Sequence, residues 1–156
     1  SPEALSVVAE SDCAVCVMHM QGEPGTMQQA PQYQNVVAEV RSFLTDAVER
    51  CRQAGIADQR IVVDPGFGFG KTLNHNLDLF SALTVAGVGE LPILVGLSRK
   101  SMLGVITGRP VGERLAGSVA AALLAAQKGA KILRVHDVAA IKDVLAVWKA
   151  IEEGAK

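Results

Sequence analysis

The chain has 156 residues, enough for one domain with a substantial core, and 49% of them are apolar whereas 20% are charged. Its formal net charge is −1, which leaves no basic field to hold nucleic acid or an anionic membrane surface. No apolar stretch approaches the roughly 20 residues of a membrane span, and the first residues lack a basic and then apolar signal pattern, so we expect a cytoplasmic protein.

The chain begins with a segment, residues 2–10, that resembles a helix of a preceding structural unit. An apolar run at residues 15–18 follows, and we predict it to be a strand. Cys13 and Cys16 are separated by two residues, which is the spacing of many metal and redox pairs. Residues three apart in a strand point to opposite faces, so we interpret Cys13, Cys16 and Cys51 as structural thiols.

Four runs rich in β-branched residues are predicted to be strands: residues 15–18, 61–63, 93–95 and 132–135. Their near-continuous apolarity indicates burial on both faces, as in a parallel sheet. Three other segments have the period of a helix with one buried stripe. The stripes comprise Val36, Val40, Phe43, Ala47, Val48 and Cys51; Leu115, Val119, Ala122, Leu123 and Ala126; and Val138, Ile141, Leu145, Trp148 and Ile151.

This alternation of strands and helices predicts an α/β fold with parallel strands. Two architectures fit the pattern: part of a (β/α)8 barrel, or a small open doubly wound sheet. Both place the working loops after the carboxyl ends of the strands. The residues that follow each apolar run are therefore the candidates for chemistry.

The second predicted strand ends in the string D-P-G-F-G-F-G-K, from Asp64 to Lys71. Its alternate glycines allow positive φ angles and close approach of the backbone to a ligand, and Phe67 and Phe69 can supply aromatic surface. The string imitates a nucleotide-binding P-loop, but the first glycine of that motif would fall at Pro65. A dinucleotide fingerprint fails as well, because the third glycine comes one residue early. The plain alternative is a glycine-rich turn into the next helix.

Basic side chains follow the third predicted strand and lie at the end of the fourth. The string S-R-K-S, residues 98–101, offers two cations and two hydroxyls at a predicted helix start, which suits an anionic or carbonyl-bearing ligand, although a solvated basic turn is commoner. Alternation puts Arg134 and His136 on the same face. A buried arginine needs an anion, which a ligand phosphate or an internal ion pair with Asp64 could supply.

The first predicted strand ends in M-H-M, residues 18–20, followed by a polar loop at residues 21–32. Methionine is more often a core residue than a ligand contact. The position of Met18 at the end of a strand nevertheless makes it a candidate for the site.

Taken in order and with their spacing, the strings M-H-M-Q-G, D-P-G-F-G-F-G-K, S-R-K-S and R-V-H-D resemble the dihydropteroate synthase family. The similarity extends over essentially the whole chain. It implies a (β/α)8 TIM barrel of the pterin-binding type, in which residues 1–156 would form the C-terminal half and contribute the fifth to the eighth strands. A full barrel has about 250 residues, and its first four strands are absent from this sequence.

The resemblance also implies roles for individual residues. Asp64 would hydrogen-bond the amino-pyrimidine edge of the pterin, Lys100 would contact the pterin carbonyl, and Met18 would pack on the ring. Arg134 would cover the ring and meet the diphosphate, and His136 would bind the diphosphate as it leaves.

The other implied substrate-binding residues are Gly68, Phe69, Gly96 and Ser101. Phe69 would form part of the p-aminobenzoate pocket, and Ser101, at a helix start, would receive the carboxylate of that substrate. The implied catalytic set consists of Asp64, Lys100, Arg134 and His136.

The activity implied by the resemblance is that of a transferase in folate biosynthesis. The amine of p-aminobenzoate would displace diphosphate from 6-hydroxymethyl-7,8-dihydropterin diphosphate and give 7,8-dihydropteroate, and sulfonamides would compete as mimics of the amine. Mg2+ is expected on the diphosphate, with no protein ligand in this half. The expected partners are these two small molecules and a second copy of the chain in a homodimer, without nucleic acid or membrane.

Two other hypotheses stay open. A methyltetrahydrofolate-binding methyltransferase barrel would keep the role of Asp64 but would need no diphosphate site. A non-catalytic pterin- or phosphate-binding module is the other, because the first four strands of the barrel carry part of the family's site. Arg134 with His136, and the S-R-K-S string, favour the synthase.

Overall fold

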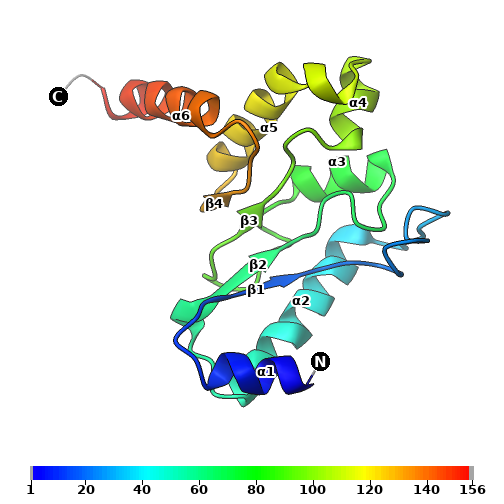
Figure 1. Ribbon diagram of the computed structural model, residues 1–156, viewed down its shortest axis with the longest axis vertical. Helices are drawn as coiled ribbons and strands as arrows, with labels where there is room; N and C mark the ends of the chain where they lie inside the picture. The colour runs from blue at the N-terminus through cyan, green and yellow to red at the C-terminus, as the bar shows by residue number, and fades with distance from the viewer. Residues whose placement is uncertain (1, 155–156) are drawn as a thin grey trace.

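The computed structural model describes residues 2–154, in which four parallel strands alternate with helices (Figure 1). Strand β1 pairs with β2 from Val15 opposite Ile61 to Met18 opposite Asp64. Strand β3 pairs with β4, and a bridge from Val63 to Ile93 joins the two ladders. The spatial order is therefore β1-β2-β3-β4, the same as the order in sequence. The strands are β1 (Val15–Met18), β2 (Ile61–Asp64), β3 (Leu94–Val95) and β4 (Ile132–Leu133).

The helices lie on one side of this row of strands, and the other side is open (Figure 1). On the helix side Ile61, Val63 and Val95 are buried, whereas Cys16 and Ile132 on the opposite face are exposed. A doubly wound sheet would carry helices on both faces, so that alternative is wrong. The helices are α1 (Pro2–Ala9), α2 (Val36–Gln53), α3 (Leu73–Ser81), α4 (Ser101–Thr107), α5 (Leu115–Gln127) and α6 (Val138–Glu153), with 3-10 turns at Asp58–Arg60 and Val111–Glu113.

Strands in sequential order with helices on one face form a section of a (β/α)8 barrel, and the predicted fold class is confirmed. The open face corresponds to the barrel lumen. The predicted fourth strand, residues 132–135, ends at Leu133 because its ladder with β3 comprises only Ile132 and Leu133. Its extended course still reaches Arg134, whose N–H donates to the carbonyl of Val95 at 2.9 Å.

Helix α2 begins with a well-formed cap. The side chain of Asn35 accepts from the N–H of Ala38, and Glu39 accepts in return from the N–H of Asn35, so two N–H groups at the helix start are satisfied. The predicted stripe is largely correct, but Phe43 is 39% exposed and Leu44 takes its place in the core. The ring of Phe43 instead meets that of His19 edge to face, at 5.0 Å between centroids.

The stripes predicted for the last two helices are only partly buried. In α5 Ala122 is buried, but Leu115 is 47% exposed. In α6 Ile141 is buried, whereas Ile151 is 74% exposed. The reason is visible in Figure 1, where α6 packs on α5 and then extends away from the strands.

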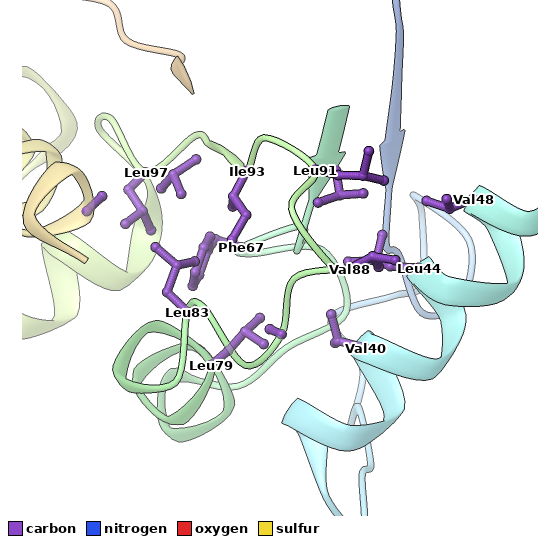
Figure 2. Close-up of a cluster of buried hydrophobic side chains, with 14 of the residues drawn as sticks. Val40, Leu44, Val48, Phe67, Leu79, Leu83, Val88, Leu91, Ile93 and Leu97 are labelled. Atoms are coloured by element: carbon purple, nitrogen blue, oxygen red, sulfur yellow. The ribbon is translucent and has the colours of Figure 1, made fainter. Parts of the chain in front are cut away.

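The core lies between the strands and helices α2 and α3, and it includes a residue from the glycine-rich loop (Figure 2). Phe67, at 1% exposure, points between Leu83 and Ile93, and its ring meets that of Phe80 at 5.9 Å. The loop after β2 is thus anchored from inside the core. Among residues 2–154, no helix combines the length and apolarity required to cross a bilayer.

Candidate active site

The predicted site residues gather at the carboxyl ends of the strands. A cavity of about 270 Å³ opens there between the ends of β3 and β4. Lys100 and Arg134 both line it, which confirms that these two cations share one pocket at one end of the sheet. The lining residues are Gly96, Ser98, Lys100, Arg134, Val135 and His136.

Asp64, the last residue of β2, is 3% exposed and lies beside this cavity. One of its carboxylate oxygens, Oδ1, accepts the N–H of Gly66 at 2.7 Å. Burial raises the pKa of the carboxyl group, and the opposing influences are the Gly66 hydrogen bond and the charges of Arg134, Lys100 and Lys71. These three cations and a single hydrogen bond hold the carboxylate ready to accept from a ligand.

Lys100 is held by the loop that follows β2. Its ammonium group donates to the carbonyl of Phe67 and lies 4.0 Å from the centroid of the Phe69 ring, a cation–π contact. Gly68 makes room for it, since a Cβ there would stand 3.2 Å from Cδ of Lys100 and φ is +75°. Burial lowers the pKa of Lys100 to about 8 against the attraction of Asp64, so the side chain is mainly charged at neutral pH.

Arg134 and His136 occupy the far side of the cavity. Arg134 crosses Gly96 so closely that a Cβ on the glycine would lie 2.9 Å from Nη2, so a side chain at residue 96 would push the guanidinium group aside. Arg134 is exposed, so the expectation of a buried arginine is wrong: β4 is an edge strand and its lumen side is uncovered. The alternative ion pair with Asp64 is also absent from residues 2–154, although Arg134 lowers the pKa of that carboxyl through space.

Ser98 fixes the orientation of His136. Its Oγ accepts the backbone N–H of His136 at 3.2 Å and lies 3.0 Å from Nδ1 of the same ring. The hydroxyl can donate its own proton to Nδ1 in the tautomer that carries the imidazole proton on Nε2. His136 then presents an N–H donor for a ligand.

The S-R-K-S loop is strained and tied down on two sides. Arg99 has φ +58°, a conformation that non-glycine residues seldom adopt. Its N–H donates to Oγ of Ser118, and its guanidinium donates to both carboxylate oxygens of Asp137, at 2.6 and 3.1 Å. These contacts hold the loop before Lys100 against the loop after His136.

Two predicted site residues lie at the margin of this arrangement. Met18 is half-buried opposite Asp64 in the β1–β2 ladder, so the two side chains emerge on the same face. Ser101 does begin a helix, α4, as predicted, but its side chain is exposed and does not line the cavity.

Sequence reasoning missed the interior support of the site. Lys71 is 4% exposed and His19 is 5% exposed, and their side chains meet at the ends of β1 and β2. Both residues belong to the M-H-M and D-P-G-F-G-F-G-K strings, so the sequence does contain a signal for them. The P-loop pattern around Lys71 and the strand-end position of Met18 favour other roles for the two strings.

The cysteine interpretation is correct in part. Cys13, Cys16 and Cys51 are all free thiols, and Cys51 is buried in α2. Cys13 and Cys16 are exposed, so these two are not core residues. Cys16 faces the lumen, where partial burial of its thiol and, to a smaller extent, the charge of Asp64 raise the pKa of that thiol.

The fold and the site together define half of a (β/α)8 barrel with a cationic cavity and one buried carboxylate at its carboxyl end. The sequence profile of the family described as "Pterin binding enzyme" matches residues 1–136. The chain therefore belongs to the pterin-binding enzyme family.

Particular relatives are dihydropteroate synthases. That of Haemophilus influenzae is 50% identical over 149 residues, which are 96% of this chain and 54% of that protein. The structure of the Yersinia pestis enzyme with a sulfonamide drug complex is 44% identical with a TM-score of 0.93, over 99% of this chain and 56% of that one. The Burkholderia cenocepacia enzyme complexed with 7,8-dihydropteroate is 48% identical with a TM-score of 0.92, over 98% and 57%.

The chain thus spans about half the length of the curated relatives it matches. The resemblance to dihydropteroate synthases, inferred from four strand-end strings, is confirmed by these comparisons.

Proposed function

We propose that this chain contributes one half of the active site of a dihydropteroate synthase, which joins 6-hydroxymethyl-7,8-dihydropterin diphosphate to p-aminobenzoate. The observation that carries the proposal is one buried carboxylate, Asp64, beside two cations, Lys100 and Arg134, at the mouth of a barrel. A carboxylate suits the amino-pyrimidine edge of a pterin, which offers N–H donors. The cations suit the diphosphate that is attached to the same molecule.

The reaction forms one C–N bond and breaks one C–O bond. The amine nitrogen of p-aminobenzoate attacks the methylene carbon of the pterin, diphosphate departs with the electron pair of the C–O bond, and the new secondary amine loses a proton. Positive charge on the pterin methylene is stabilised by the carboxylate of Asp64. Negative charge on the diphosphate is met by Arg134 and by the Nε2–H of His136.

Lys100 lies between the two parts of the ligand. Its contact with the carbonyl of Phe67 and its position over the Phe69 ring hold the ammonium group, which interacts electrostatically with Asp64. There it can donate to the pterin carbonyl, and Phe69 can form one wall for the aromatic amine. The helix start at Ser101 is proposed for the carboxylate of that substrate, and a sulfonamide would compete for the same place.

We also propose that Mg2+ binds the diphosphate, because phosphate oxygens are preferred ligands of this ion. Within the part of the chain that the structure describes, no group of three His, Cys, Asp or Glu side chains could hold a metal ion. The residues present therefore do not build a metal site by themselves, and no step above passes through a metal. A homodimer and a cytoplasmic location are proposed on the same resemblance.

The test uses a complete barrel, meaning this chain together with the further strand–helix units that complete a (β/α)8 barrel. We expect it to form 7,8-dihydropteroate and release one diphosphate for each product. Binding of the pterin diphosphate without turnover in the presence of p-aminobenzoate would instead indicate a non-catalytic pterin-binding module. Methyl transfer from methyltetrahydrofolate, with no use of the diphosphate, would indicate the methyltransferase alternative.

A further inference from the structure

Lys71 is a buried cation that makes no contact with the cavity. It follows the glycine-rich loop and is 4% exposed. Its Nζ lies 2.9 Å from Nδ1 of His19, 2.9 Å from the carbonyl oxygen of Gly66 and 3.2 Å from that of Phe69. An ammonium group has three N–H donors, and here each one has an acceptor.

The two carbonyl contacts are at the two ends of one turn. The N–H of Phe69 donates to the carbonyl of Gly66 at 3.1 Å, so residues 66–69 close a four-residue turn. Lys71 binds the first and the last carbonyl of this turn. The side chain therefore holds the turn closed from inside the protein.

This turn determines where the site residues point. The N–H of Gly66 donates to Oδ1 of Asp64, the carbonyl of Phe67 receives Lys100, and the ring of Phe69 lies under Lys100. Gly66 is thus bound on both sides, through its N–H to the carboxylate and through its carbonyl to Lys71. A loosened turn would release all three contacts together.

The third contact ties the turn to the end of β1. Burial and the charge of Lys71 lower the pKa of His19 to about 4, so its ring is neutral at pH 7 and Nδ1 can accept from the ammonium group. Gly66 lies against the same residue, because a Cβ there would come within 1.8 Å of the carbonyl oxygen of His19. The M-H-M and D-P-G-F-G-F-G-K strings are therefore joined physically through Lys71.

We propose that Lys71 is a positioning residue of the site, whose ammonium group closes the turn at residues 66–69 and thereby sets the places of Asp64, Phe69 and Lys100. The proposal rests on the proposed function only for the ligand that the site receives. The closed turn itself belongs to the protein without ligand. The two can therefore be tested apart.

The first experiment measures amide hydrogen exchange in the ligand-free complete barrel. The variant is Lys71→Met, which keeps the aliphatic stem and removes the three donors, with Lys71→Gln as a milder change and exposed Lys149→Met as the control. We expect exchange at Gly66 and Phe69 to accelerate at least tenfold in Lys71→Met, less in Lys71→Gln and not at all in Lys149→Met. Unchanged exchange in both Lys71 variants would overturn the proposal, whether or not the protein makes dihydropteroate.

The second experiment measures affinity for the pterin diphosphate and for diphosphate alone. We expect Lys71→Met to lower the affinity for the pterin diphosphate roughly tenfold and to leave the affinity for diphosphate unchanged, because Arg134 and His136 do not depend on the turn. If Lys71 had a merely structural role, the substitution would lower the affinity for both ligands alike, and that result would overturn the positioning assignment. Wild-type protein that binds neither ligand would contradict the proposed function instead, while the exchange result would still decide the role of Lys71.

The pH dependence separates Lys71 from its charged neighbours, which are His19 at the end of β1, Asp64 on β2 and Lys100 after β3. A neutral amine has only two N–H donors. As the pH rises through the Lys71 pKa of about 7, the side chain therefore loses one of its three contacts with His19, Gly66 and Phe69. We expect the affinity of the wild-type protein for the pterin to fall as the pH rises through 7. In Lys71→Met this decrease in affinity should disappear, whereas a decrease near the Lys100 pKa of about 8 should remain. A wild-type profile that the substitution leaves unaltered would overturn the proposal.

Discussion

Nζ of Lys71 lies 2.9 Å from Nδ1 of His19, so two basic side chains share one buried contact. Only one of them can be charged without strong repulsion. His19 is the neutral partner, because its pKa is lowered to about 4 while that of Lys71 is lowered only to about 7. The proton therefore resides on the lysine, which also binds two backbone carbonyls.

The pair makes stability depend on pH with a definite sign. Each group binds protons more tightly in the unfolded chain, so unfolding takes up protons from pH about 4 to 6.5 for His19 and from about 7 to 10.5 for Lys71. The free energy of unfolding should rise with pH through both windows. Urea denaturation of the complete barrel should show that His19→Asn flattens the lower window and Lys71→Met the upper one. Parallel profiles for wild type and variants would contradict this assignment.

Gly66→Ala should destabilise the protein strongly. The new Cβ would lie 1.8 Å from the carbonyl oxygen of His19, and φ at this position is +71°. Backbone displacement and strain should together cost more than about 2 kcal/mol of unfolding free energy. Gly112→Ala is the matched control, because a Cβ there has open space and no positive φ. Equal melting temperatures for the two variants would show that the His19–Gly66 contact is not as close as described.

Ser98→Ala should weaken the diphosphate end of the site without changing the pterin end. The substitution removes the hydroxyl that accepts the N–H of His136 and fixes its ring. One such hydrogen bond is worth about 0.5–1.5 kcal/mol, so diphosphate affinity should fall about two- to tenfold. Exposed Ser42→Ala should have no effect. A loss of affinity for the pterin alcohol, which has no diphosphate, would argue against a role limited to His136. Fluorescence quenching measures this affinity.

Much of this arrangement was predictable from the sequence because strand ends carry the chemistry of parallel α/β folds. Asp64, Lys100, Arg134 and His136 were placed at one end of the sheet from alternation and from the four strings, and they lie there. Helix α4 begins at Ser101 as expected.

The errors have physical causes that no local pattern reveals. The exposure of Arg134 depends on how much of the lumen the rest of a barrel covers. The burial of Leu44 instead of Phe43 depends on the rotation of α2 against the sheet. The role of Lys71 depends on a turn that brings two carbonyls to one ammonium group, and a buried lysine is uncommon enough that the default assumption is a solvated one.

The isolated 156-residue chain should not behave as a monomer. Its lumen face exposes Ile132 and part of Val62 and Leu94, and β1 and β4 are open edges. Each large apolar side chain left in water forfeits about 1.5–3 kcal/mol, which is considerable against a domain stability of about 5–15 kcal/mol. Sedimentation equilibrium at micromolar concentration should find dimers or larger species. A single monomeric species with a cooperative melting transition would show that this half-barrel is self-sufficient.

The proposed pterin and diphosphate sites are tested together by calorimetric titration of the complete barrel with 6-hydroxymethyl-7,8-dihydropterin diphosphate, the pterin alcohol and diphosphate. The prediction is that the pterin alcohol and diphosphate each bind, and that the pterin diphosphate binds more tightly than either. Asp64→Ala should lower the affinity for the pterin alcohol at least tenfold and change the affinity for diphosphate little. Asp46→Ala, an exposed carboxylate on α2, is the control. Unchanged pterin affinity in Asp64→Ala would contradict the account, because the buried carboxylate at the end of β2 would then not be the pterin-binding group.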